Sequence, residues 1–87
     1  MKINLVTFAN SDYMTTDRIA EQAKEFGIFD KIIQTNEENI KEFIEKHRNF
    51  INTHKAGYGL WIWKPKIIYD TLIKLQDNEI LIYCDAG

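Results

Sequence analysis

The chain has 87 residues, of which 45% are hydrophobic and 28% are charged. This composition is sufficient for one small domain and too apolar for a disordered chain. The formal net charge of −2, with acidic and basic residues mixed along the sequence, excludes the broad positive surface that binds nucleic acid or an anionic membrane.

The N-terminus alternates like a strand and has no apolar run of signal-peptide or membrane-spanning length. We therefore expect a cytoplasmic protein without a transmembrane segment. A single cysteine, Cys84, excludes an internal disulfide, and we interpret it as a small buried apolar residue.

The first two predicted elements are a strand and a helix. Residues 3–8 are mostly β-branched or apolar and lead into a polar cluster, which predicts a strand that opens into a loop. Residues 14–26 carry apolar side chains at helical spacing. Thr15 or Thr16 can cap the start of this helix, and Gly27 can end it.

A second strand and a second helix follow. Residues 29–35 form a short apolar stretch between turn-forming residues, which favours a strand. Thr35 or Asn36 can cap a helix that extends to about Thr53, because apolar residues recur three or four positions apart.

The last part of the chain predicts a third helix and a third strand. A glycine-bearing turn at residues 56–59 leads to a helix that begins near Pro65, since proline is tolerated in a first turn. Its apolar stripe extends to residue 75, and residues 79–84 then form a mostly apolar strand.

This order of elements predicts an α/β fold with about three parallel strands in a two-layer or three-layer open sheet, similar to half of a Rossmann sheet. We expect one domain over residues 1–87, and an incomplete one, because so small a sheet leaves exposed edges. Such an edge favours a partner chain or self-association.

Ligands of open parallel sheets bind beyond the carboxyl ends of the strands. Polar residues follow all three predicted strands there, at residues 9–11, 35–36 and 85–87. The first strand is followed by neither a GxGxxG segment nor a P-loop, so dinucleotide and ATP sites of those kinds are not expected.

Asp85 is the candidate metal ligand. A carboxylate at the tip of a strand can bind Mg²⁺ or Mn²⁺, and these cations bridge diphosphates. The alternative interpretation is a simple Asp-Ala-Gly turn.

The most unusual segment is GYGLWIWKP at residues 57–65. Its aromatic side chains can stack on a base or a sugar, and Lys64 could meet a phosphate near a helix N-terminus. The alternative is that Trp61 and Trp63 fill the core, which we expect of at least one of them.

Other candidate clusters are weaker. His47 and His54 are seven residues apart without a third ligand at metal spacing, and we interpret both as structural or surface residues. Ser11 lacks the GxSxG turn of a hydrolytic nucleophile. Asp12 and Asp85 form only a minimal version of the acidic cluster of a receiver-like regulatory domain.

The segment at residues 57–65, followed by ILIYCDAG at residues 80–87, resembles a group of glycosyltransferases in which a GYGYWxWKP helix precedes a YxDAG strand. In that group the strand occupies the position of the DxD motif of the nucleotide-diphospho-sugar transferase fold of GT-A type. The resemblance extends over essentially the whole chain, including the end of the first strand at residues 6–9.

The resemblance implies transfer of a sugar from a nucleotide-diphosphate donor. It places Thr7, Phe8 and Ala9 near the base, with Asn10 beside them. It places Trp63 and Lys64 near the diphosphate or the sugar, and Asp85 at the Mn²⁺ or Mg²⁺ ion.

Two features depart from that family. Gly87 stands where the motif has its second carboxylate, and the chain stops before the region that would supply the acceptor site. We therefore expect a fragment, a truncated gene product or one half of a split enzyme. Such a chain would be inactive alone and would bind a nucleotide sugar weakly or not at all. The alternative from another class is a small α/β module that binds a protein partner through its sheet edge and aromatic turn.

Overall fold

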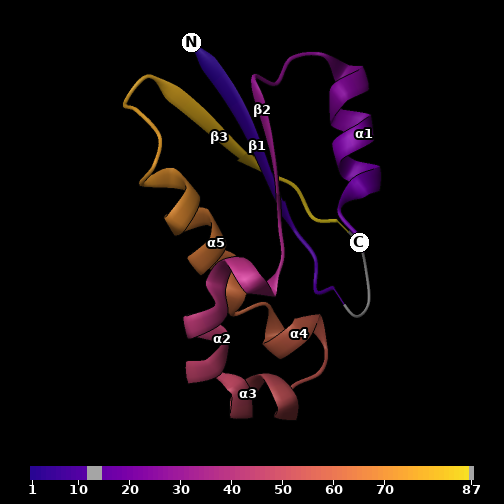
Figure 1. The fold of residues 1–87 in the computed structure, drawn as a ribbon, viewed down its shortest axis with the longest axis vertical. Coiled ribbons are helices and arrows are strands. Elements are labelled where there is room, and N and C mark those ends of the chain that lie inside the picture. Colours follow the sequence, from indigo (N-terminus) through magenta and orange to yellow (C-terminus); the bar gives the residue numbers. More distant parts are fainter. Residues whose placement is uncertain (12–14, 87) are drawn as a thin grey trace.

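The computed structural model describes residues 1–11 and 15–86, in which a parallel sheet has the strand order β2-β1-β3. The strands are β1 (Lys2–Phe8), β2 (Lys31–Thr35) and β3 (Glu79–Tyr83). Helix α1 (Asp17–Phe26) covers one face, and the other helices lie on the opposite face and beyond the carboxyl ends of the strands (Figure 1). They are η1 (Glu37–Ile40), α2 (Lys41–Lys46), α3 (Arg48–Thr53), α4 (Gly57–Leu60) and α5 (Trp63–Leu72). The predicted α/β fold is confirmed, in its three-layer form.

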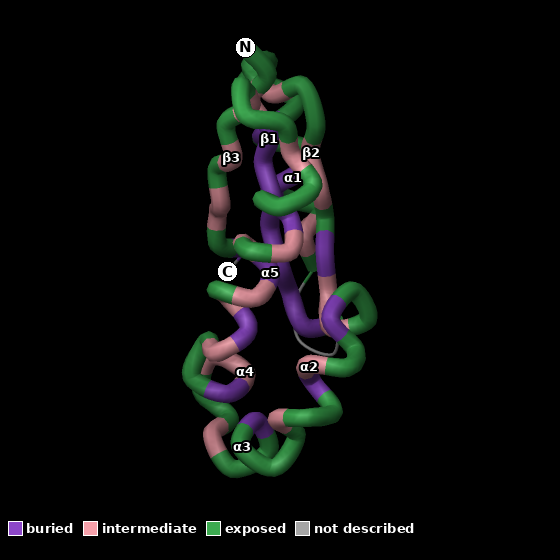
Figure 2. Tube along the Cα trace, turned by 90° about the vertical axis from the view of Figure 1, so that its left-hand side faces the viewer, coloured by how far each residue is buried: buried purple, intermediate pink, exposed green. Residues whose placement is uncertain are grey.

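Strand β1 is the centre of the molecule and is buried along most of its length (Figure 2). Because side chains alternate along a strand, Val6 and Phe8 face the core under α2, α3 and α5. Leu5 and Ala9 face the smaller core under α1. The central position of β1 therefore gives the sheet two apolar faces.

Helix α1 ends as its sequence predicts. Gly27 adopts a left-handed conformation with φ of 77°, and its N–H donates to the carbonyl of Ala23 at 3.3 Å. At the other end, the Thr15 hydroxyl accepts a hydrogen bond from the N–H of Asp17 at 3.2 Å. The predicted starting residue, Met14, lies outside the described residues.

The prediction of one continuous helix after β2 was wrong, because the segment forms three short pieces. His47 adopts φ of −111° and ψ of 18°, and its N–H is shared between the carbonyls of Phe43 and Ile44. Apolar spacing does not reveal such a break, since the buried side chains before and after it still face the same core. The predicted cap is confirmed: the Asn36 side chain accepts from the N–H of Glu38 at 2.9 Å.

Helix α5 begins at Trp63, which leaves Pro65 in the first turn as expected. It ends at Leu72 rather than at residue 75. Three-residue turns replace the last helical residues, with Leu75 donating to the carbonyl of Leu72 at 3.1 Å. The third strand begins at Glu79, as predicted.

The chain connections define a crevice at the carboxyl ends of β1 and β3. The connection from β1 to β2 passes over one face of the sheet through α1. The connection from β2 to β3 passes over the other face and crosses β1. Ligands of open α/β sheets bind where successive connections leave in opposite directions, which here is beside the end of β1.

Strands β2 and β3 form the two edges of the sheet. On β3, Ile80 and Ile82 pair with Ile3 and Leu5 and therefore lie on the α1 face of the sheet, where they are 41% and 39% exposed. Association through this edge stays a prediction. None of the described helices combines the length and the apolar character that crossing a membrane requires.

Candidate functional site

A cavity of about 320 Å³ opens at the carboxyl end of β1. One wall comes from the end of this strand and the loop after it, and the other from the segment that precedes α5. Four of the lining side chains are aromatic and one is cationic. The lining residues are Phe8, Ala9, Asn10, Lys55, Gly57, Tyr58, Trp61 and Trp63.

A left-handed turn forms much of the wall. It comprises residues 57–61, which are the segment labelled α4 and Trp61 after it. All five residues have φ between 52° and 86°, and the non-glycine members are Tyr58, Leu60 and Trp61. Each of these three costs roughly 1–2 kcal/mol in this conformation. The backbone bonds that close the turn run from Leu60 N–H to Ala56 at 2.8 Å and from Trp61 N–H to Gly57 at 3.0 Å.

At the two glycines of the turn, neighbouring side chains occupy the space that a Cβ atom would need. A Cβ on Gly57 would lie 2.3 Å from the indole of Trp61, and a Cβ on Gly59 would lie 2.7 Å from Cγ1 of Ile51. The Trp61 ring therefore lies directly against the Gly57 backbone. Because Trp61 is 51% exposed, the ring is available at the cavity for stacking.

Trp63 belongs to the core and lines the cavity at the same time. It is 6% exposed, and its indole stacks on Phe8 with ring centroids 4.1 Å apart. Its Nε1 donates to the carbonyl of Gly57 at 2.9 Å. The expectation that at least one of the two tryptophans fills the core is confirmed for Trp63, whereas Trp61 is exposed.

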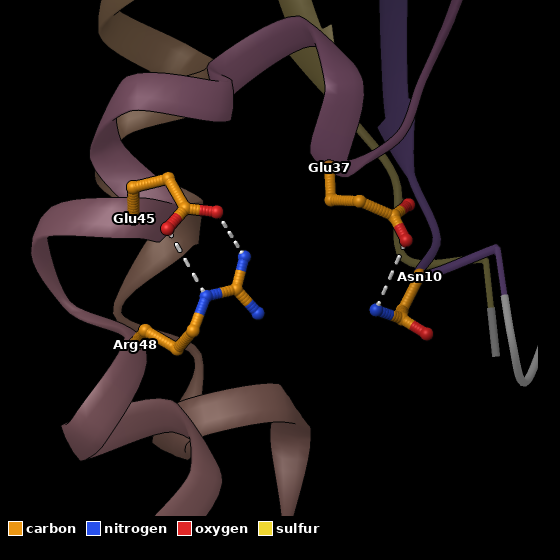
Figure 3. Close-up of polar contacts among 4 residues, drawn as sticks. All are labelled: Asn10, Glu37, Glu45 and Arg48. Carbon is orange, nitrogen blue, oxygen red and sulfur yellow. Dashed lines mark hydrogen bonds and ion pairs between the residues drawn. The ribbon is translucent and has the colours of Figure 1, made fainter.

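The loop after β1 is held by Glu37, the first residue of η1. The Glu37 carboxylate accepts from the N–H of Ser11 at 3.0 Å, from its hydroxyl at 2.7 Å and from the Asn10 side chain at 3.4 Å. Figure 3 shows the contact with Asn10 together with the ion pair between Arg48 and Glu45, which joins α3 to α2. Partial burial alone would raise the pKa of Glu37, but the Ser11 hydrogen bonds outweigh it and the pKa is lowered.

Lys64 and Asp85 form an ion pair at the ends of α5 and β3. The Lys64 Nζ lies 3.1 Å from the Asp85 carboxylate and 5.2 Å from the centre of the Tyr83 ring. Burial raises the pKa of the Tyr83 hydroxyl, and the nearby Asp85 carboxylate raises it further.

The structure brings together four of the predicted site residues, since Phe8, Ala9, Asn10 and Trp63 line one cavity. Lys64 and Asp85 pair with each other and do not line it. Thr7 is fully buried, and strand alternation places its side chain on the α1 face.

Several residues of this region, Lys55, Trp61 and Glu37 among them, were not predicted from the sequence as site residues. Lys55 lines the cavity, and its position just before the glycine-bearing turn was the available signal. Trp61 belongs to the aromatic segment, but the sequence does not show which of Trp61 and Trp63 is exposed and which is buried. Glu37 follows a helix cap, and its bonds to Ser11 join residues 26 positions apart, which no local pattern reveals.

Other predicted clusters take no part in the cavity. Among residues 1–11 and 15–86, no group of three His, Cys, Asp or Glu side chains is arranged to hold a metal. The ring of His47, at the break between α2 and α3, packs on Phe43, and the ring of His54, just after α3, packs on Phe50. Asp12 lies outside the described residues, and so does Gly87.

No protein-family model matches the chain, and no solved structure gives a significant match. The chain is 34% identical over 67 residues to the glucose-1-phosphate adenylyltransferase of Lachnospira eligens. The match covers 77% of this chain but only 14% of that protein, so the chain corresponds to a small part of this relative. The similarity fits a coarse relationship to the nucleotide-diphospho-sugar transferases.

Proposed function

We propose that the cavity at the carboxyl end of β1 binds a nucleoside-diphosphate sugar, and that the chain forms a nucleotide-binding part of a transferase. One observation carries the proposal: four aromatic side chains and the amide of Asn10 surround a single cavity at the crevice of an open parallel sheet. This is the position where such sheets bind nucleotides.

The size and chemistry of the cavity suit one planar or ring-shaped part of this ligand. Its volume of about 320 Å³ lies at the lower end of the range of small-molecule sites. The exposed Trp61 ring offers a face on which a base or a sugar can stack. The Asn10 amide, which donates to Glu37 at 3.4 Å, supplies a polar group.

The comparison supports the ligand class. The relative is named as an enzyme that transfers an adenylyl group to glucose 1-phosphate. Joining these two groups forms a nucleoside diphosphate attached to a sugar, which is the ligand proposed here. The finer proposal, transfer of the sugar to an acceptor, rests on the resemblance of the segments GYGLWIWKP and YCDAG to glycosyltransferases.

A divalent cation at Asp85 was part of that resemblance, and the described residues do not fit it by themselves. The Asp85 side chain is 66% exposed and is already paired with Lys64. No described His, Cys, Asp or Glu completes a group of three around it. A hard cation needs several oxygen ligands, which the described residues around Asp85 do not supply.

Thermal-shift titration with UDP-glucose, GDP-glucose and ADP-glucose tests the proposal, because a ligand that binds only the folded chain raises its melting temperature. We expect a saturable rise with one of the three nucleotides, and its loss in Trp61→Ala. Tyr69→Ala, which removes an exposed aromatic side chain far along α5, is the matched control and should keep the response. A folded chain that responds to none of the three would contradict the proposal.

A further inference from the structure

We infer that the cavity binds the anionic group of its ligand through Lys55, and that this binding needs no divalent cation. The inference deepens the proposed function, since it concerns the same cavity and assigns the phosphate-binding role to a residue outside the Trp-Lys-Pro segment. It also separates this chain from transferases in which a metal ion neutralises the diphosphate.

The charges around the cavity favour an anionic ligand. Lys55 is the cationic side chain among the lining residues. The ion pairs within the described part of the chain join Arg48 to Glu45, Lys64 to Asp85 and Lys66 to Asp70, and Lys55 belongs to none of them. A lysine at the edge of a cavity, without a carboxylate partner among the described residues, can turn its ammonium toward an anion bound there.

Backbone hydrogen bonds connect Lys55 to the left-handed turn. The Lys55 carbonyl accepts from the N–H of Tyr58 at 3.1 Å, and the His54 carbonyl accepts from the N–H of Gly59 at 2.7 Å. These bonds tie Lys55 to the start of the left-handed turn that carries Trp61. The cation and the stacking surface therefore belong to one short segment, as a ligand with a phosphate next to a planar group requires.

The ion pair of Lys64 with Asp85 disfavours both a phosphate and a divalent cation at this pair. Its ammonium lies 3.1 Å from the Asp85 carboxylate, which neutralises the acidic group proposed for a metal. A divalent cation at Asp85 would be repelled by Lys64, and a phosphate at Lys64 would be repelled by Asp85. Lys55 meets neither obstacle among the described residues.

A ¹H–¹⁵N NMR titration of the whole chain with inorganic pyrophosphate, in the presence of EDTA, tests the inference. We expect saturable shifts of the backbone amides of residues 55–61. Lys55→Met should weaken the binding by ~10-fold or more, because a charge-assisted hydrogen bond contributes about that factor. Lys64→Met, the matched loss of a lysine, should change it by less than about twofold. In a second titration, excess Mg²⁺ replaces EDTA. After correction for the binding of Mg²⁺ to free pyrophosphate, the affinity of the chain for pyrophosphate should change by less than about twofold.

Three outcomes would overturn the inference: no saturable shift, loss of binding in Lys64→Met but not in Lys55→Met, or binding that requires Mg²⁺. The spectra of both variants show directly whether they are folded. Pyrophosphate contains neither base nor sugar, so its binding is independent of the nucleotide response. Failure of the proposed function would instead appear as pyrophosphate binding without any effect of the nucleotide sugars on melting.

Discussion

The indole of Trp63 stacks on the phenyl ring of Phe8, with the two ring planes inclined by 23°. This contact joins the start of α5 to the end of β1. Because Trp63 also donates a hydrogen bond to Gly57, the same side chain holds the left-handed turn in place. One wall of the cavity is therefore a continuation of the hydrophobic core.

The two tryptophans of the segment should differ in their effect on stability. Trp63→Ala removes a buried aromatic ring and should lower the free energy of unfolding by about 3–5 kcal/mol. Trp61→Ala removes a half-exposed ring and should cost less than about 1 kcal/mol. Urea unfolding followed by circular dichroism measures both. Equal losses would show that Trp61 is a core residue as well.

Gly59 should tolerate a side chain poorly. In Gly59→Ala the added methyl group would overlap Ile51 in a backbone with φ of 86°, and we expect a loss of about 2–3 kcal/mol. Gly27→Ala is the matched control, because Gly27 has a similar φ of 77° but no atom nearer than 3.9 Å to the added Cβ. It should cost only about 1 kcal/mol of backbone strain. If the two variants unfolded at the same denaturant concentration, contact with Ile51 would not be what restricts position 59.

The contact of Glu37 with the loop after β1 should be sensitive to acid. Its folded-state pKa lies below the ordinary value of 4.5, so the contact stabilises the fold fully above that value. The stabilisation is lost as the pH falls through the lowered pKa. Melting temperatures of the wild type and Glu37→Gln should therefore differ at pH 7 and converge toward pH 3.

Glu21→Gln, on an exposed position of α1, is the control and should leave the melting temperature at pH 7 nearly unchanged. If the gap between the wild type and Glu37→Gln were constant from pH 7 to pH 3, the carboxylate would not be the group that holds Ser11.

Much of the fold followed from local patterns in the sequence. The alternation of β1, the end of α1 at Gly27 and the Asn36 cap were all predicted, because each depends on a few neighbouring residues. The break at His47 was not, since the apolar side chains on both sides of it still face one core.

The candidate site could be predicted only in part. The aromatic segment and the end of β1 were selected by their composition and by the rule that ligands bind beyond strand ends. The left-handed turn places Trp61 at the cavity, just after Lys55, and a left-handed conformation at three non-glycine residues has no sequence pattern that predicts it. The ion pair of Lys64 with Asp85 joins distant residues and likewise appears only in the structure.

The most direct test of the central claim is a calorimetric titration with the nucleotide sugar that raises the melting temperature, using the wild type, Trp61→Ala and Tyr69→Ala. Base–aromatic stacking contributes roughly 1–3 kcal/mol, so Trp61→Ala should weaken binding by ~5-fold to 150-fold, while Tyr69→Ala should match the wild type. Equal affinity in all three proteins would place the ligand outside the aromatic cavity and contradict the account.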